Sequence, residues 1–290
     1  MNKYLRESLD FLLFSNLFIA LCSMSQGLVT YQLLHQQPQK QVLGLLFCST
    51  LLLYNFSILL IRPKEPEKSS FRRVRWIFSH YRFMLLLSAL AVLALIPLAL
   101  YLSFPTQIVL ALLGIISLAY GLPIFRSHNR RFGLRNIPGI KLILIALVWS
   151  ISAVLIPILE LENKQSISIP MDQTLLLLAK RFLFVAAITI PFDIRDLFQD
   201  QLHAVKTLPV MLGEKKAYLV CQFLLLVYLV LLLFFTKEFD RNFWGLALTV
   251  LLAGWLIFRS NWKKNEYYYF LYLDGTLILQ FLMLMLVNVL

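Results

Sequence analysis

Long apolar runs separated by short polar segments make up most of the chain. The runs are rich in leucine and do not alternate between apolar and polar positions, so they predict helices rather than the strands of a membrane barrel. A helix needs about 20 residues, at about 1.5 Å each, to cross the hydrocarbon layer. Nine runs qualify, at residues 10–34, 41–61, 83–104, 106–121, 140–160, 173–192, 216–236, 243–258 and 267–289.

These runs predict an all-α, polytopic membrane protein in which residues 1–290 form one transmembrane domain. The third and fourth runs meet at Phe104-Pro105-Thr106, which predicts a tight hairpin turn there. The first run is preceded by charged residues and lacks a small-residue cleavage site. We therefore expect it to be a retained helix rather than a signal peptide.

The composition excludes a soluble globular protein. Hydrophobic residues make up 60% of the chain and charged residues 14%, and the mean hydropathy is +0.76. Soluble domains average about 45–50% apolar and about 25% charged residues. Lipid must therefore solvate much of the surface.

The positive charges indicate orientation. With the N-terminus in the cytoplasm, most Lys and Arg residues fall in cytoplasmic loops, and the opposite loops hold only Lys40, Lys164, Lys237 and Arg241. This is the distribution that the positive-inside rule expects. The net charge of +12 is thus a topology signal, and we expect no nucleic acid partner.

Three aspartates at the end of the sixth run carry the clearest chemical signal. Asp193, Asp196 and Asp200 are spaced i, i+3 and i+7, which places their carboxylates on one face of a helix. Clusters of oxygen ligands suit hard cations such as Mg²⁺, which in turn bridges to substrate phosphates. The alternative is a solvated acidic turn, neutralised in part by Arg195 and Lys206. The chain has only 15 acidic residues, and three of them fall on one helix face at a membrane boundary. This concentration favours a functional site over a solvated turn.

The segment around these aspartates resembles the second Asp-rich motif of the UbiA-type intramembrane prenyltransferase superfamily. The three aspartates are followed in register by Lys206-Thr207 and Leu212-Gly213, although Ala204 replaces the usual glycine. A second stretch, Tyr120-Gly121-Leu122-Pro123 followed by a basic loop and residues 134–141, is similar to the loop between helices four and five of that family.

The resemblance implies nine transmembrane helices around a central cavity, in an integral protein of a bacterial plasma membrane with its Asp motifs on the cytoplasmic side. It implies a prenyltransferase (transfer of alkyl groups other than methyl) that moves a prenyl group from a prenyl diphosphate to a lipophilic acceptor with Mg²⁺. Asp193, Asp196 and Asp200 are then the expected metal ligands, and Asp196, Asp200 and Tyr120 the expected catalytic residues. The expected substrate-binding residues are Asn55, Arg72, Arg75, Arg126, Lys141, Arg195 and Lys206.

The chain departs from the family at the first motif, which normally supplies Asn-Asp-x-x-Asp at the end of helix two. Here only Asn55 fits, and Phe56 and Leu59 stand where aspartates are expected. Three interpretations fit this loss. In the first, the enzyme runs on one metal, with arginines from 72–75 replacing the second. In the second, it catalyses a different isoprenoid reaction, and in the third it binds a polyprenyl lipid without turning it over.

A transporter is the remaining class, but no clear internal repeat supports it, and the polar cluster lies at one edge of the membrane.

Other polar residues inside the runs have two interpretations each. Asn16 either lines the cavity or bonds a neighbouring helix. Asp274 is either a functional group or the partner of a buried cation such as Arg181. Among the aromatic residues, Tyr54 and Tyr120 are expected near the site.

Overall fold

The computed structural model is helical almost throughout, as the sequence predicts. It describes residues 3–60, 63, 65–122, 125–127, 130–134, 137, 139–202, 206–234, 239–261 and 263–289. The described strands are two of three residues each, β1 (Phe125–Ser127) and β2 (Arg130–Phe132), which pair antiparallel in the loop after α6. The helices are α1 (Lys3–Phe14), α2 (Leu17–Leu33), α3 (Lys40–Leu60), η1 (Pro66–Lys68), α4 (Arg72–Ser79), α5 (Tyr81–Tyr101), α6 (Phe104–Gly121), α7 (Ile140–Ser150), η3 (Ile151–Leu155), α8 (Ile156–Gln165), α9 (Met171–Arg195), α10 (Leu197–Leu202), α11 (Leu208–Leu212), α12 (Glu214–Phe234), α13 (Arg241–Arg259), η4 (Tyr268–Leu273) and α14 (Gly275–Val289).

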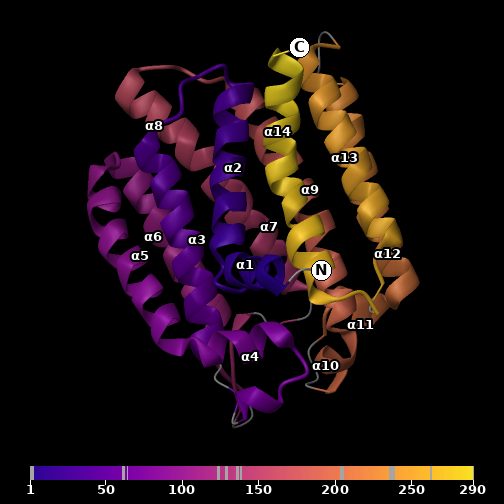
Figure 1. Cartoon of the computed structure of the whole chain (residues 1–290). Coiled ribbons are helices and arrows are strands. Elements are labelled where there is room, and N and C mark those ends of the chain that lie inside the picture. Colours follow the sequence, from indigo (N-terminus) through magenta and orange to yellow (C-terminus); the bar gives the residue numbers. More distant parts are fainter. Residues whose placement is uncertain are drawn as a thin grey trace.

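The membrane spans agree with the nine apolar runs. Within the described residues, eight helices are long and apolar enough to cross a membrane, counting α7–α8 and η4–α14 as continuous helices. The pair α1 and α2 supplies a ninth span if the two helices are counted as one. The chain is therefore an integral membrane protein, and its spanning helices lie side by side in one bundle (Figure 1).

The first span is bent by 61° between α1 and α2. At the bend, Asn16 has a φ of 67°, in the left-handed region. Asparagine enters that region more readily than most residues with a side chain. The bend turns α1 across one end of the bundle, where it lies close to α4 (Figure 1).

The hairpin between α5 and α6 lies slightly before its predicted position. The turn falls at Leu102 and Ser103, and Pro105 belongs to the first turn of α6. A proline is tolerated there because the first N–H groups of a helix have no intrahelical acceptor. Glu160 fixes the turn, accepting hydrogen bonds from the backbone N–H and the hydroxyl of Ser103 at 2.7 and 2.6 Å.

The prediction that the three aspartates share one helix is wrong. Helix α9 ends at Arg195, Asp196 adopts a non-helical conformation as its C-cap, and α10 begins at Leu197. Asp196 still links the two helices, because its carbonyl accepts the Asp200 backbone N–H at 2.9 Å. The carboxylates thus lie at a helix junction rather than along a helix face.

The largest hydrophobic cluster joins residues of α2, α7, α9, α12, α13 and α14. Helix α9 packs against both α7 and α12, so its cavity-facing end is held from both sides. Helices α4, α10 and α11 gather at the end of the bundle opposite the C-terminus, next to the end of α9 (Figure 1). Two stretches are π-helical: η3, which joins α7 to α8, and η4, which leads into α14.

Candidate active site

A cavity of about 210 Å³ opens at the end of the bundle where α1, α4 and the end of α9 meet. Helices α1, α2, α3, α4, α7, α9 and α14, together with η4, contribute to its wall. The polar residues that line it are Asn16, Tyr54, Arg73, Lys141, Thr189, Asp193, Arg195, Asp196 and Asp274. The rest of the wall is apolar or aromatic and includes Ile145, Trp149, Val185, Ile188, Phe192, Phe270 and Leu277. A charged rim and an apolar interior therefore share one space.

On the α9 side of the cavity, each lining carboxylate is paired with a cation. Lys141 Nζ lies 2.5 Å from Asp193 Oδ1. The Arg195 guanidinium forms a fork on Asp196, with Nε 2.8 Å from Oδ1 and Nη2 2.9 Å from Oδ2. Charge-assisted pairs of this kind hold the side chains in place and keep carboxylates and cations together at the cavity wall.

The Arg195 guanidinium is also enclosed by aromatic rings. Its carbon lies 5.4, 5.2 and 5.2 Å from the ring centroids of Phe192, Tyr269 and Phe270. Cations at such distances from aromatic faces are stabilised by the ring quadrupole. Its Nη1 is buried and has no hydrogen-bond partner in the described part of the chain, so this wall offers a free donor to an anion.

On the opposite side, α4 contributes Arg73. Its Nη2 donates to Asn16 Oδ1 at 2.5 Å, and its guanidinium carbon lies 4.7 Å from the centroid of Phe270. Asn16 Nδ2 in turn donates to Asn55 Oδ1 at 2.7 Å. Burial, with Arg195 nearby, lowers the pKa of Arg73 below its ordinary value. Arg73 Nε and Asn55 Nδ2 are buried without partners among the described residues.

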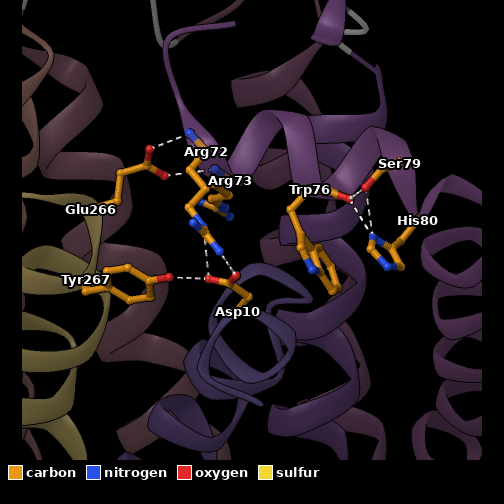
Figure 2. Close-up of polar contacts among 8 residues, drawn as sticks. All are labelled: Asp10, Arg72, Arg73, Trp76, Ser79, His80, Glu266 and Tyr267. Atoms are coloured by element: carbon orange, nitrogen blue, oxygen red, sulfur yellow. Dashed lines mark hydrogen bonds and ion pairs between the residues drawn. The ribbon is translucent and has the colours of Figure 1, made fainter. Parts of the chain in front are cut away.

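Helix α4 is held by residues that are distant in the sequence (Figure 2). The Glu266 carboxylate accepts the backbone N–H of Arg72 at 2.7 Å and that of Arg73 at 3.0 Å, so it caps the N-terminus of α4. Asp10 on α1 accepts hydrogen bonds from the Arg72 guanidinium and from the Tyr267 hydroxyl. A carboxylate at a helix N-terminus also interacts favourably with the helix dipole.

Asp200 lies beside the cavity rather than in its lining. Burial raises its pKa, and Lys141, Asp193 and Asp196 are close enough to influence its charge. Its Oδ2 is buried without a partner in the described part of the chain. The structure thus gathers the three predicted carboxylates at one junction. Within the described residues, however, no three acidic, histidine or cysteine side chains already form a metal-binding group.

The predicted substrate-binding residues divide into two groups. Lys141 and Arg195 line the cavity, and Asn55 lies directly behind Asn16. Arg72 is engaged with Asp10, and Arg75 is exposed and donates to the carbonyls of Ser69 and Ser70.

The remaining predicted site residues are less closely tied to the cavity. Lys206 is exposed. The side chain of Arg126 lies outside the described residues. Tyr120, on α6, lies close enough to Tyr54 and Lys141 to influence both electrostatically.

The sequence suggested that arginines from 72–75 replace a second metal, but nothing in it separated Arg73 from its neighbours. Glu266 gave no signal in the sequence and was not predicted as a site residue. Two residues with open interpretations are now placed. Asn16 both lines the cavity and bonds α3. Asp274 lines the cavity and, within the described residues, forms no ion pair with Arg181, which donates to Thr30 instead.

The fold and the cavity define an α-helical integral membrane protein with a charged chamber at one end of its bundle. The model of the UbiA prenyltransferase family matches residues 78–269, and the chain belongs to that family. No curated protein matches the chain by sequence.

Solved structures share the fold at low identity. A UbiA homologue from Archaeoglobus fulgidus bound to GPP and Mg²⁺ superposes with a TM-score of 0.66 at 12% identity, covering 97% of this chain and 100% of its own. The same homologue bound to DMAPP and Mg²⁺ gives a TM-score of 0.64 at 13% identity with the same coverage. The apo structure of a UbiA homologue from Aeropyrum pernix K1 gives 0.62 at 14% identity, covering 93% of this chain and 95% of its own.

Proposed function

We propose that this protein is an intramembrane prenyltransferase that moves a prenyl group from a prenyl diphosphate to a lipophilic acceptor, with Mg²⁺. One observation carries the proposal: buried donors without partners face a cavity whose other walls are carboxylate-bearing at the rim and apolar inside. A prenyl diphosphate has the matching division between a charged head and a greasy tail. The UbiA homologue from Archaeoglobus fulgidus binds two such diphosphates, GPP and DMAPP.

The carboxylate side fits one divalent cation. Its donors are carboxylate oxygens, which hard cations prefer, and the partnerless Asp200 Oδ2 is an oxygen that a cation would satisfy. Asp196 and Asp200, supported by Asp193, would hold the ion. Bound there, Mg²⁺ would neutralise charge on the leaving diphosphate.

The cationic side chains bind and orient the diphosphate head. Arg195 and Lys141 already lie at the cavity wall, and their pairs with Asp196 and Asp193 keep them oriented toward it. As the bond between the prenyl C1 and the diphosphate oxygen breaks, both electrons leave on the diphosphate. These donors stabilise the charge that develops there.

The apolar wall holds the prenyl tail. Trp149, Phe192 and Phe270 line it, and aromatic faces stabilise a nearby carbocation. Exclusion of water prevents its addition to that cation, so the acceptor forms the new bond to C1. The proton displaced from the acceptor leaves with the diphosphate. We further propose that the cavity and the N-terminus lie on the cytoplasmic side of a bacterial plasma membrane. The positive-inside distribution of Lys and Arg supports this orientation.

The test uses the purified full-length protein, GPP or DMAPP, Mg²⁺ and a membrane lipid extract as the source of acceptor. We expect release of diphosphate and formation of a prenylated lipid. The double variant Asp196→Asn/Asp200→Asn should lose at least about 100-fold in rate, since it removes the charged ligands of an electrostatic site.

Asp172→Asn is the matched control. Asp172 lies at the exposed far end of the same helix, α9, so the change alters one carboxylate on that helix without touching the cavity. Equal diphosphate binding by wild type and double variant, with no release from either, would exclude the enzyme and leave a lipid-binding protein.

A further inference from the structure

We propose that Arg73 binds the diphosphate from the α4 side of the cavity, as a fixed guanidinium among mostly neutral polar side chains. The inference rests on the proposed function and assigns one residue to it. Asn16, Tyr54 and Asn55, which lie on or behind that part of the wall, are neutral. Asp274 is the carboxylate described near them, and the described positive charge there comes from Arg73.

The first argument is that Arg73 lacks the acidic partner that nearby cations have. Lys141, Arg195 and Arg72 each form an ion pair with an aspartate. Arg73 forms none among the described residues, and its contacts are a neutral amide and an aromatic ring. Its Nε is buried and unsatisfied in the same part of the chain. A partly buried charge and a buried, unpaired donor both cost stability, and an anion in the cavity would offset both costs.

The second argument is that two like charges face the same space. The guanidinium carbons of Arg73 and Arg195 lie 4.7 and 5.2 Å from the centroid of the same ring, Phe270. Arg195 has its own unpaired Nη1. Asp274 also lines the cavity, but it forms no ion pair with either arginine in the described structure. The Arg195 fork is already on Asp196, but its Nη1 and the Nε of Arg73 remain to donate to the oxygens of a diphosphate.

The third argument is that the protein holds Arg73 in place. The Glu266 carboxylate binds the backbone N–H of Arg73 itself, and Ile77 of the same short helix is fully buried. Phe14 and Trp76 pack against each other with ring centroids 6.2 Å apart. An arginine that served only to mark the cytoplasmic side would need neither burial nor a capped backbone.

The experiment measures binding of inorganic diphosphate and of GPP by calorimetry, with the full-length protein in detergent, in the presence of Mg²⁺ or of EDTA. For Arg73→Gln we expect about 10- to 100-fold weaker binding of both probes, as expected for loss of charge-assisted hydrogen bonds. For Arg73→Lys, which keeps the charge but loses the planar fork, we expect a loss of about 10-fold. The loss should persist in EDTA, where only the protein's own cations remain.

Arg82→Gln is the matched control, because Arg82 is an exposed arginine in the first turn of the next helix, α5. It should bind both probes within about twofold of wild type, as surface charge contributes little. Gel filtration and thermal unfolding show whether each variant is folded. If Arg73→Gln does not fold, the binding measured for Arg73→Lys tests the proposal instead.

The inference is overturned if folded Arg73 variants bind both probes as wild type does, or if Arg82→Gln loses as much as Arg73→Gln. Failure of the proposed function would give a different result. In that case the wild type itself would neither bind GPP in preference to inorganic diphosphate nor release diphosphate from GPP.

Discussion

Replacing Glu266 with alanine should loosen α4 without unfolding the bundle. The carboxylate accepts two backbone hydrogen bonds at the N-terminus of α4, at 2.7 and 3.0 Å, and the alanine variant removes both. The ion pair between Arg72 and Asp10 and the buried side chain of Ile77 remain. The effect is therefore expected to be local to α4.

The magnitude follows from the two interactions that are lost. Removing a helix cap costs about 0.5–2 kcal/mol, and removing a negative charge from a helix N-terminus costs about 0.3–1 kcal/mol. Together they amount to on the order of 1–3 kcal/mol. Because each 1.4 kcal/mol corresponds to a factor of ten, opening of the first turn of α4 should become about 5- to 150-fold more frequent.

Hydrogen exchange measured by mass spectrometry reports this opening directly. In the wild type, the amides of Arg72 and Arg73 are protected by Glu266, so the peptide that contains them should exchange faster in the variant. Diphosphate binding should weaken in parallel, since Arg73 belongs to the same turn. Glu266→Gln keeps one acceptor oxygen and should fall between the two.

Glu67→Ala is the control, because Glu67 is an exposed acid in the turn just before α4. It should leave exchange in α4 unchanged. Unaltered exchange at Arg72 and Arg73 in a folded Glu266→Ala variant would show that the carboxylate does not hold the helix. The account of how Arg73 is positioned would then fail.

Three further outcomes are expected. Removal of Mg²⁺ with EDTA should stop diphosphate release, and returning Mg²⁺ should restore it in the wild type but not in Asp196→Asn/Asp200→Asn. Burial raises the pKa of Asp200 above its ordinary value of 3.8, so its charge is lost earlier than usual on acidification. Mg²⁺-dependent diphosphate binding, titrated against pH, should therefore weaken with a midpoint above 3.8. Finally, a Cβ on Gly27 would lie 2.5 Å from Leu46 Cδ1. Gly27→Leu should therefore overpack this contact, lower the free energy of unfolding by about 1–3 kcal/mol and so lower the thermal unfolding temperature. Gly114→Leu, at a position with nothing within 4 Å, should leave that temperature nearly unchanged.

The spans could be predicted from the sequence because lipid fixes the length of an apolar helix. The same argument could not find the bend at Asn16, since a continuous apolar run hides a change of direction. The spacing of the three aspartates correctly indicated that they gather, but it could not show that α9 ends before Asp196. Pro191 lies within α9, so the nearest helix-breaking residue did not mark the end of the helix.

The choice among neighbouring arginines depends on contacts between distant parts of the chain. Successive residues of a helix point about 100° apart, so Arg73 points away from Arg72 and Arg75, which are three residues apart and lie on the same side. Which of them enters the cavity is decided by Glu266 and Asp10, which lie far from α4 in the sequence. Lys141 was predicted from the resemblance of residues 134–141 to a loop of the family, because Asp193 lies 52 positions further along the chain and no local pattern joins the two.

The π-helical turn η4 has a consequence for the register of the last span. A π-turn is equivalent to one extra residue in an α-helix, so the segment before it is rotated by about 100° relative to a regular continuation. In this orientation Glu266 and Tyr267 reach α4 and α1, while Asp274 and Leu277 still face the cavity. Deleting a single residue within Tyr268–Leu273 would preserve a membrane-spanning helix yet swing its leading end away from the arginines. Inserting or deleting one residue there should thus leave membrane insertion intact but disrupt ligand binding.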